Sequence, residues 1–215
     1  MLGALTALVF GMVAVRVAAT QTDEYLNLPW NLFLAWIPFA VALLVYDRAR
    51  RGGGALALFG LAGLWLLFFP NAPYLVTDLK YLRVIHNAPI WFDVVLVGAA
   101  AVCGLALGFL SLYLIHAVAE RRFGATRAWV GVLAMLLLSS VGVFLGRFQR
   151  FNSWDVFTDP KPILDDLAKG LADPLGYPEV LAITVVFGGF LVASYAVFYA
   201  LARFGRLLGD ESQSA

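Results

Sequence analysis

Six long apolar stretches limit this chain to a structure that can lie largely within lipid. They cover residues 2–19, 28–46, 54–69, 91–119, 129–147 and 177–202. A helix that crosses a bilayer needs about 20 mostly apolar residues, because its backbone N–H and C=O groups must pair with one another inside the segment. The pattern therefore predicts an all-α, polytopic transmembrane bundle of about six helices, with residues 1–215 forming a single integral membrane domain.

The composition agrees with this class and excludes several functions. The chain is 62% hydrophobic and 13% charged, whereas soluble domains are about 45–50% apolar and about 25% charged. Its net charge of +1 gives no polyelectrolyte character, so we expect no nucleic-acid partner. One cysteine, Cys103, excludes an intramolecular disulfide framework, and His86 and His116 fall in separate regions. With no phosphate-loop, zinc-protease or redox motif present, we expect no metal and no cofactor.

Basic residues gather in alternate connections, which predicts the orientation. The positive-inside rule places arginine-rich short connections in the cytoplasm. The first connection, by contrast, contains only the acids Asp23 and Glu24. We therefore expect both termini in the cytoplasm, and the long connections 70–90 and 148–176 outside. The arginines that support this orientation are Arg48, Arg50 and Arg51, Arg121, Arg122 and Arg127, and Arg203 and Arg206.

Each long outer connection is predicted to contain a short interfacial helix. At helical spacing, residues 162–172 have apolar residues on one face and charged residues on the other, and residues 74–85 carry an apolar stripe. Such helices lie on a bilayer surface or cover the end of a bundle, and both roles remain open. The apolar face of 162–172 comprises Ile163, Leu164, Leu167, Ala168 and Leu171, and the stripe of 74–85 comprises Leu75, Leu79 and Leu82.

Small residues and isolated polar residues give weaker expectations inside the spans. Glycines recur four residues apart at Gly104 and Gly108, and at Gly142 and Gly146. Such pairs allow close helix contact in lipid, either within the bundle or in a dimer. Arg16 interrupts the first span near its outer end. We expect it to extend toward the headgroups, with an ion pair inside the bundle as the alternative. His116 is expected at the inner interface.

The first polar segment follows the third span, at residues 68–79. We expect the helix to stop here, because Pro70 removes a backbone donor and Pro73 disfavours α geometry at Ala72. A helix that ends at the membrane boundary leaves backbone groups for side chains, water or a ligand to satisfy. Asn71 can supply both a donor and an acceptor. A purely structural stop capped by Asn71 is the alternative.

The second polar segment, residues 146–155, follows the fifth span. Arg147 and Arg150 are three residues apart and would share one face of a helix. A guanidinium fork suits a carboxylate or a phosphate. Structural partners are available in Asp78, Asp93 and Asp155. The alternative is that an arginine remains free for an anionic ligand.

Together the two polar segments resemble one known family. The resemblance rests on Phe-Pro-Asn-Ala-Pro-Tyr at 69–74 with Thr77-Asp78, and on Gly-Arg-Phe at 146–148 with Asn-Ser-Trp-Asp at 152–155. These motifs look like the bacterial membrane-protein family catalogued as domain of unknown function 1361, and the resemblance covers nearly the whole chain. It implies a multi-pass protein of the bacterial cytoplasmic (inner) membrane. It implies no activity and no catalytic residue.

Three functions fit these observations. The first is a binding or accessory protein with an outward-facing polar site for an anionic small molecule or lipid headgroup, in contact with the bilayer and with another membrane protein or a second copy. The second is an enzyme acting on a lipid-linked or cell-envelope substrate, with Asp78, Asp93 or His86 handling protons. The third is a small transporter using breaks at Pro38 and 70–73, which the lack of internal similarity disfavours. The candidate ligand-binding residues are Asn71, Tyr74, Asp78, Asp93, Arg147, Arg150, Asn152 and Asp155.

Overall fold

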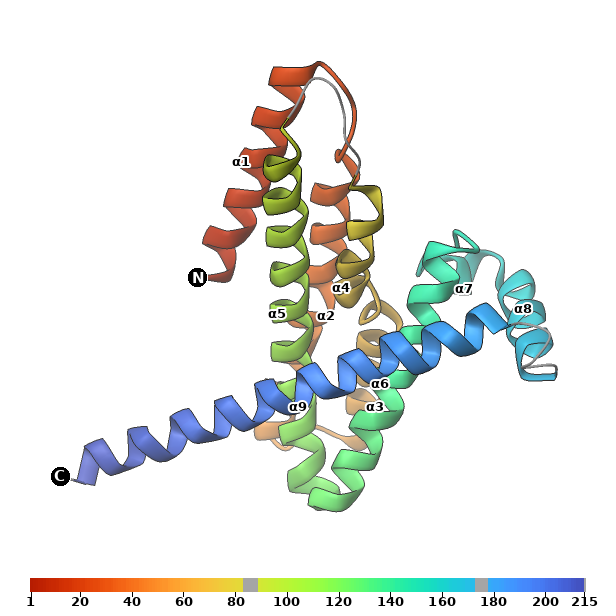
Figure 1. Ribbon diagram of the computed structural model, residues 1–215. Helices are drawn as coiled ribbons and strands as arrows, with labels where there is room; N and C mark the ends of the chain where they lie inside the picture. The colour runs from red at the N-terminus through yellow and green to blue at the C-terminus, as the bar shows by residue number, and fades with distance from the viewer. Residues whose placement is uncertain (83–88, 173–177, 215) are drawn as a thin grey trace.

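The computed structural model describes residues 1–82, 89–172 and 178–214, and this part of the chain is helical without a strand (Figure 1). Six helical segments within it are long and apolar enough to cross a membrane. The predicted all-α transmembrane bundle is therefore confirmed. The elements are α1 (Leu2–Thr20), α2 (Asn27–Arg50), α3 (Ala55–Phe68), α4 (Asn71–Tyr74), the 3-10 helix η1 (Leu75–Tyr81), α5 (Ile90–Phe123), α6 (Ala125–Arg147), α7 (Asp155–Thr158), α8 (Pro160–Ala172) and α9 (Pro178–Ser214).

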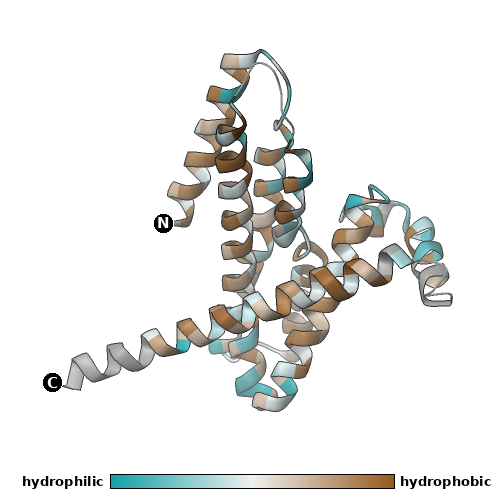
Figure 2. Cartoon of the chain, viewed as in Figure 1, coloured by the Kyte–Doolittle hydropathy of each residue, from teal (hydrophilic) through white to brown (hydrophobic). Residues whose placement is uncertain are grey.

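Helices α2 and α5 form the centre of the bundle. α5 packs against α1, α2 and α6, while α2 also packs against α3. α9 crosses α6 at a steep inclination and reaches α5 (Figure 1). Apolar residues cover the long helices, whereas hydrophilic ones gather at the turns and around α7 and α8 (Figure 2). Large apolar side chains such as Val186 and Leu201 on α9 are mostly exposed, as expected for a surface that faces lipid.

The third span is longer than the sequence predicts. After α3 the chain continues through α4 and η1, so that the apolar helical segment runs from Ala55 to Tyr81. α3 ends at Phe68, as the prolines predict, and a turn at residues 69–70 precedes α4. Ala72 nevertheless adopts α geometry despite Pro73, so the chain resumes a helical course directly after the stop. The short helix predicted at 74–85 is present in its described part as η1. Of its two possible roles, packing on the bundle is the one observed, because Leu75 is fully buried against α5 rather than lying on a surface. Residues 83–85 lie outside the described residues.

Both glycine pairs pack against this irregular segment. A Cβ added to Gly104 would lie 2.5 Å from the carbonyl oxygen of Ala72, and one added to Gly142 would lie 2.7 Å from Pro70 Cγ. Gly108 and Gly146 likewise face α4. The glycines are therefore internal contacts, and they let α5 and α6 hold α4 between them.

Gly104→Ala should destabilise the protein, because the new methyl group would collide with backbone at Ala72. Overpacking of this kind costs about 1–3 kcal/mol. The matched control is Gly98→Ala on the same helix, where an added Cβ meets nothing within 4 Å. Melting temperatures in detergent should fall for Gly104→Ala and stay equal or rise for Gly98→Ala. Equal melting temperatures for the two variants would contradict the close approach of α4.

Arg16 does not extend to the headgroups as expected. It is 2% exposed, and its Nε and Nη2 donate to the two carboxylate oxygens of Asp93 on α5 at 2.7 and 3.1 Å. Its Nη1 donates to the Thr20 hydroxyl at 2.6 Å, and the Tyr25 hydroxyl donates to Asp93 at 3.3 Å. Burial, reinforced by Asp93, raises the pKa of Tyr25 to about 12. The Tyr25 hydroxyl therefore remains a donor at neutral pH.

Two further predictions concern the position of His116 and the helix expected at residues 162–172. His116 is 1% exposed rather than interfacial, and its Nδ1 lies 3.0 Å from the Tyr195 hydroxyl. The expectation fails because α9 covers this part of α5. The predicted helix at 162–172 is confirmed as α8, which starts slightly earlier, at Pro160. On it Ile163 is buried, whereas Leu164 is 61% exposed.

Candidate functional site

Arg147, the last residue of α6, joins that helix to the third span. Its Nη2 donates to Asp78 Oδ1 at 2.6 Å, and its Nε donates to the Thr77 hydroxyl at 2.8 Å. The guanidinium carbon lies 4.0 Å from the centre of the Tyr74 ring. The side chains of Arg147 and Asp78 are at most 2% exposed. Of the three carboxylates that the sequence offered as partners, Asp78 is the one that Arg147 binds.

Both oxygens of the Asp78 carboxylate accept hydrogen bonds. Asn31 Nδ2 on α2 donates to Asp78 Oδ2 at 3.2 Å, while Arg147 binds Oδ1. The pair therefore links α2, η1 and α6 at the end of the bundle opposite the arginine-rich turns. A buried charge pair is stable only when its remaining polar atoms are also satisfied, and here Thr77 and Asn31 supply those bonds.

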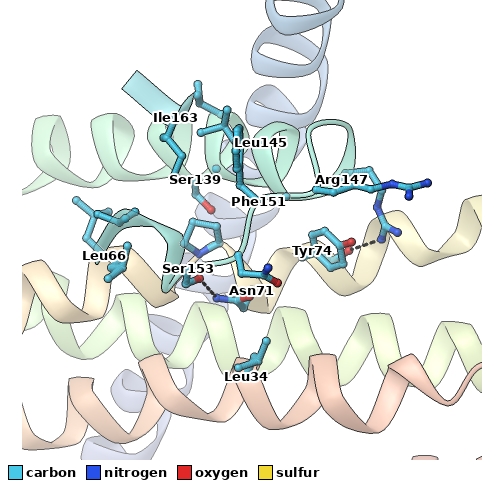
Figure 3. A pocket seen from close by; sticks show the side chains of 18 of the residues that line it. Leu34, Leu66, Asn71, Tyr74, Ser139, Leu145, Arg147, Phe151, Ser153 and Ile163 are labelled. Carbon is cyan, nitrogen blue, oxygen red and sulfur yellow. Dashed lines mark hydrogen bonds between the residues drawn. The ribbon is translucent and has the colours of Figure 1, made fainter. Parts of the chain in front are cut away.

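A cavity of about 880 Å³ lies beside this pair, between α2, α3, α6, the segment after α6, and α8. Figure 3 shows Arg147 and Tyr74 at one end of it and Leu66 at the other. Its walls are mainly apolar, with polar side chains gathered toward the Arg147 end. The apolar walls include Leu34, Leu66, Leu138, Leu145, Val156 and Ile163.

Asn71 brings the two polar segments of the sequence together. Its Nδ2 donates to the Ser153 hydroxyl at 2.9 Å, although the two residues are 82 positions apart (Figure 3). The same amide nitrogen donates to the Phe68 carbonyl at 2.9 Å, which satisfies one free backbone group at the end of α3. Asn71 therefore caps the helix end and also lines the cavity.

Arg150 lines the same cavity as Arg147 but differs from it in exposure and in hydrogen bonding. α6 ends at Arg147, and Arg150 has a φ of 62°, so the expected shared helix face does not exist. Arg150 is exposed, lines the cavity, and has no hydrogen bond or ion pair within the described ranges. Its guanidinium is therefore available to an anion, whereas most donors of Arg147 are already used.

The predicted site residues fall into two groups. The carboxylates lie outside the cavity lining: Asp78 lies behind Arg147, Asp93 binds Arg16, and Asp155 accepts a bond from the backbone N–H of Asn152 at 2.6 Å. His86, a candidate general base, lies outside the described residues. The residues that do line the cavity are Asn71, Tyr74, Arg147, Arg150 and Asn152.

The candidate residues chosen from the sequence omitted several polar residues that line the cavity, namely Asn31, Tyr81, Ser139 and Ser153. Asn31 and the adjacent pair Ser139 and Ser140 interrupt long apolar stretches, and that interruption was the available signal. A second cavity of about 500 Å³ shares Asn31, Tyr74, Tyr81 and Arg147 with the first and also includes Asp23 and Glu24. Among the described residues no group of three His, Cys, Asp or Glu side chains could hold a metal ion.

The fold and this site define a multi-pass helical membrane protein in which a buried arginine–aspartate pair adjoins an amphipathic cavity. The family model described as "Protein of unknown function (DUF1361)" matches residues 30–206, and the chain belongs to this family. The matched range includes both polar segments, so the resemblance drawn from them is confirmed. No curated protein and no solved structure matches the chain.

Proposed function

We propose that this protein binds an amphipathic anionic ligand, a lipid with a phosphate-containing headgroup, in the 880 Å³ cavity. The observation that carries the proposal is the combination of apolar walls with an exposed arginine, Arg150, that has no partner in the described part of the chain. The proposal makes the protein a binding or accessory protein of the membrane.

The chemistry of the lining supports this ligand class. The volume falls within the range of about 300–1,000 Å³ found for small-molecule sites. Leu66 and Leu138 offer a surface for hydrocarbon, while Asn71, Asn152 and Ser153 offer hydrogen bonds near Arg150. Because bilayer lipid is itself apolar, tails gain little by entering such a cavity. Selectivity must therefore come from the headgroup, for which a guanidinium fork provides two-point recognition.

Binding is a better proposal than catalysis by proton transfer. The described residues that line the cavity include no Asp, Glu or His. The acids proposed for an enzyme, Asp78 and Asp93, are instead held by Arg147 and Arg16. The carboxylates therefore serve to hold the helices together.

For the location we propose the bacterial inner membrane, with both termini in the cytoplasm. Arg51 directly follows α2 and Arg122 lies in the last turn of α5, so both border turns at the end of the bundle opposite the cavity. The positive-inside rule places those turns in the cytoplasm. The cavity would then open in the outer half of the bilayer and receive ligands from that leaflet.

The test is binding of dioleoylphosphatidylglycerol to purified protein, measured by native mass spectrometry. Arg150→Gln should weaken binding about tenfold or more, because a hydrogen bond to a charged group is worth about 1.5–3 kcal/mol. The melting temperature without lipid should stay unchanged, because Arg150 is exposed and lacks a described partner. The control is Arg127→Gln, an exposed arginine near the other end of α6. Equal affinity for both variants would refute the assignment of Arg150.

A further inference from the structure

The hydroxyl of Ser139 has no partner although it is completely buried. Ser139 is 0% exposed, and its Oγ has no hydrogen bond among the described residues. The side chain lines the cavity, and Figure 3 shows its oxygen pointing into the space between α3 and α6. A buried hydroxyl without a hydrogen-bond partner is unfavourable, because it has lost its bonds to water without replacing them. Some compensating bond is therefore expected when the cavity is filled.

Other buried hydroxyls of the bundle behave differently. Ser140 donates to the carbonyl of Leu137 at 2.6 Å, and Ser111 donates to that of Gly108 at 2.8 Å. A serine inside a helix usually satisfies its hydroxyl by donating a hydrogen bond to a backbone carbonyl of the preceding turn. Ser139 is next to Ser140 on the same helix and makes no such bond. The difference is that Ser139 faces a cavity.

The depth of Ser139 in the cavity indicates which part of a bound ligand must carry a polar group. Along α6 it lies about 12 Å from Arg147, at about 1.5 Å per residue. It is therefore well below the polar end of the cavity, at the level of apolar lining residues such as Leu138. A ligand that satisfies it must carry a hydrogen-bonding group within its hydrophobic part, and a carbonyl oxygen is the group that acyl chains offer there.

We infer that the ligand of this cavity is an acyl lipid whose ester or amide carbonyl accepts a hydrogen bond from Ser139. This inference rests on the proposed function. In a glycerolipid the ester carbonyls lie between the phosphate and the hydrocarbon tails. Ser139 is placed in the same way, because it lies deeper in the cavity than Arg147 and Arg150. A polyisoprenyl phosphate has only hydrocarbon at that depth and would leave the hydroxyl unpaired.

The experiment compares two lipids with the same headgroup and chains, dioleoylphosphatidylglycerol and its dialkyl-ether analogue, which lacks the carbonyls. The wild-type protein should bind the ester roughly two- to tenfold more tightly than the ether, the range expected for one net hydrogen bond. Ser139→Ala should bind both lipids equally. Ser140→Ala is the control, because that hydroxyl is bonded to its own helix, and it should keep the wild-type ratio.

A second measurement separates this role from a purely structural one. Without lipid, Ser139→Ala should melt at or above the wild-type temperature, because the change removes an unsatisfied hydroxyl. Equal binding of ester and ether by the wild type would overturn the inference and leave the proposed function standing. Binding of neither lipid by the wild type would overturn the proposed function, and the inference with it.

Discussion

Arg16→Ala should destabilise the protein by about 3–5 kcal/mol, the cost of removing one partner of a buried ion pair. Among the described residues, the change would leave the Asp93 carboxylate, 1% exposed, with only the Tyr25 hydroxyl as a donor. For a chain of this size each kcal/mol lowers the melting temperature by roughly 2–4 °C. Thermal unfolding in detergent should therefore shift downward by roughly ten degrees.

The chain offers a matched control for this prediction. Arg51 and Asp47 form the same kind of arginine–aspartate ion pair at 3.0 Å, but their side chains are 78% and 57% exposed. Exposed pairs of this kind contribute at most about 1 kcal/mol, so Arg51→Ala should melt close to the wild type. Arg16→Met combined with Asp93→Leu should recover much of the loss, since no buried charge is left unpaired and Glu24, the other acid near Arg16, is 47% exposed. An Arg16→Ala variant as stable as Arg51→Ala would show that the Arg16–Asp93 pair does not form.

The contrast between Arg16 and the spans shows what the sequence can and cannot predict. The spans follow from composition, because lipid imposes the same requirement on every segment that crosses it. The partner of a single arginine depends on which helices become neighbours. Arg16 and Asp93 are 77 positions apart and meet because α1 packs on α5. Nothing local to Arg16 distinguishes that arrangement from one in which it reaches the headgroups.

The third span shows tertiary packing adding to a local rule. Pro70 and Pro73 should end a helix, and α3 does end at Phe68. The glycines of α5 and α6 then leave room for the following segment at Gly104 and Gly142, so the chain resumes as α4 and η1 between them. The glycine pairs and the prolines were each recognised in the sequence. Their mutual contact depended on the placement of three helices and could not be predicted from spacing.

The candidate site was only partly predicted, because it too depends on contacts between distant parts of the chain. The two polar segments do meet, through Asn71 and Ser153. The end of the fifth span at residue 147 was also predicted correctly, since α6 ends at Arg147. However, the sequence did not indicate which arginine is buried, because the partner of Arg147 is Asp78, 69 positions away on another element. That tertiary contact makes Arg147 a structural residue, whereas Arg150 lies beyond the helix and is exposed.

Arg147→Ala should also destabilise the protein by about 3–5 kcal/mol, again because a buried carboxylate would lose its counter-charge. Within the described part of the chain, Asp78 would keep only the bond from Asn31, and Thr77 would lose its contact with the guanidinium. Arg147→Lys should recover only part of the stability. A lysine supplies the charge but not a planar fork that reaches Asp78 and Thr77 together while stacking on a ring.

A double-mutant cycle on melting temperature isolates the Arg147–Asp78 pair. Arg147→Met and Asp78→Leu should each be destabilising, whereas the double variant should be more stable than the sum of the two losses predicts. Arg150→Gln is the control, because it removes a neighbouring positive charge that is exposed and should leave the melting temperature unchanged. Additive losses would show that Arg147 and Asp78 do not stabilise each other. If Arg147→Lys and Arg147→Ala both melt like the wild type, the guanidinium lies free at the surface instead. The structural role would then be excluded, and Arg147 would join Arg150 as a donor to the ligand.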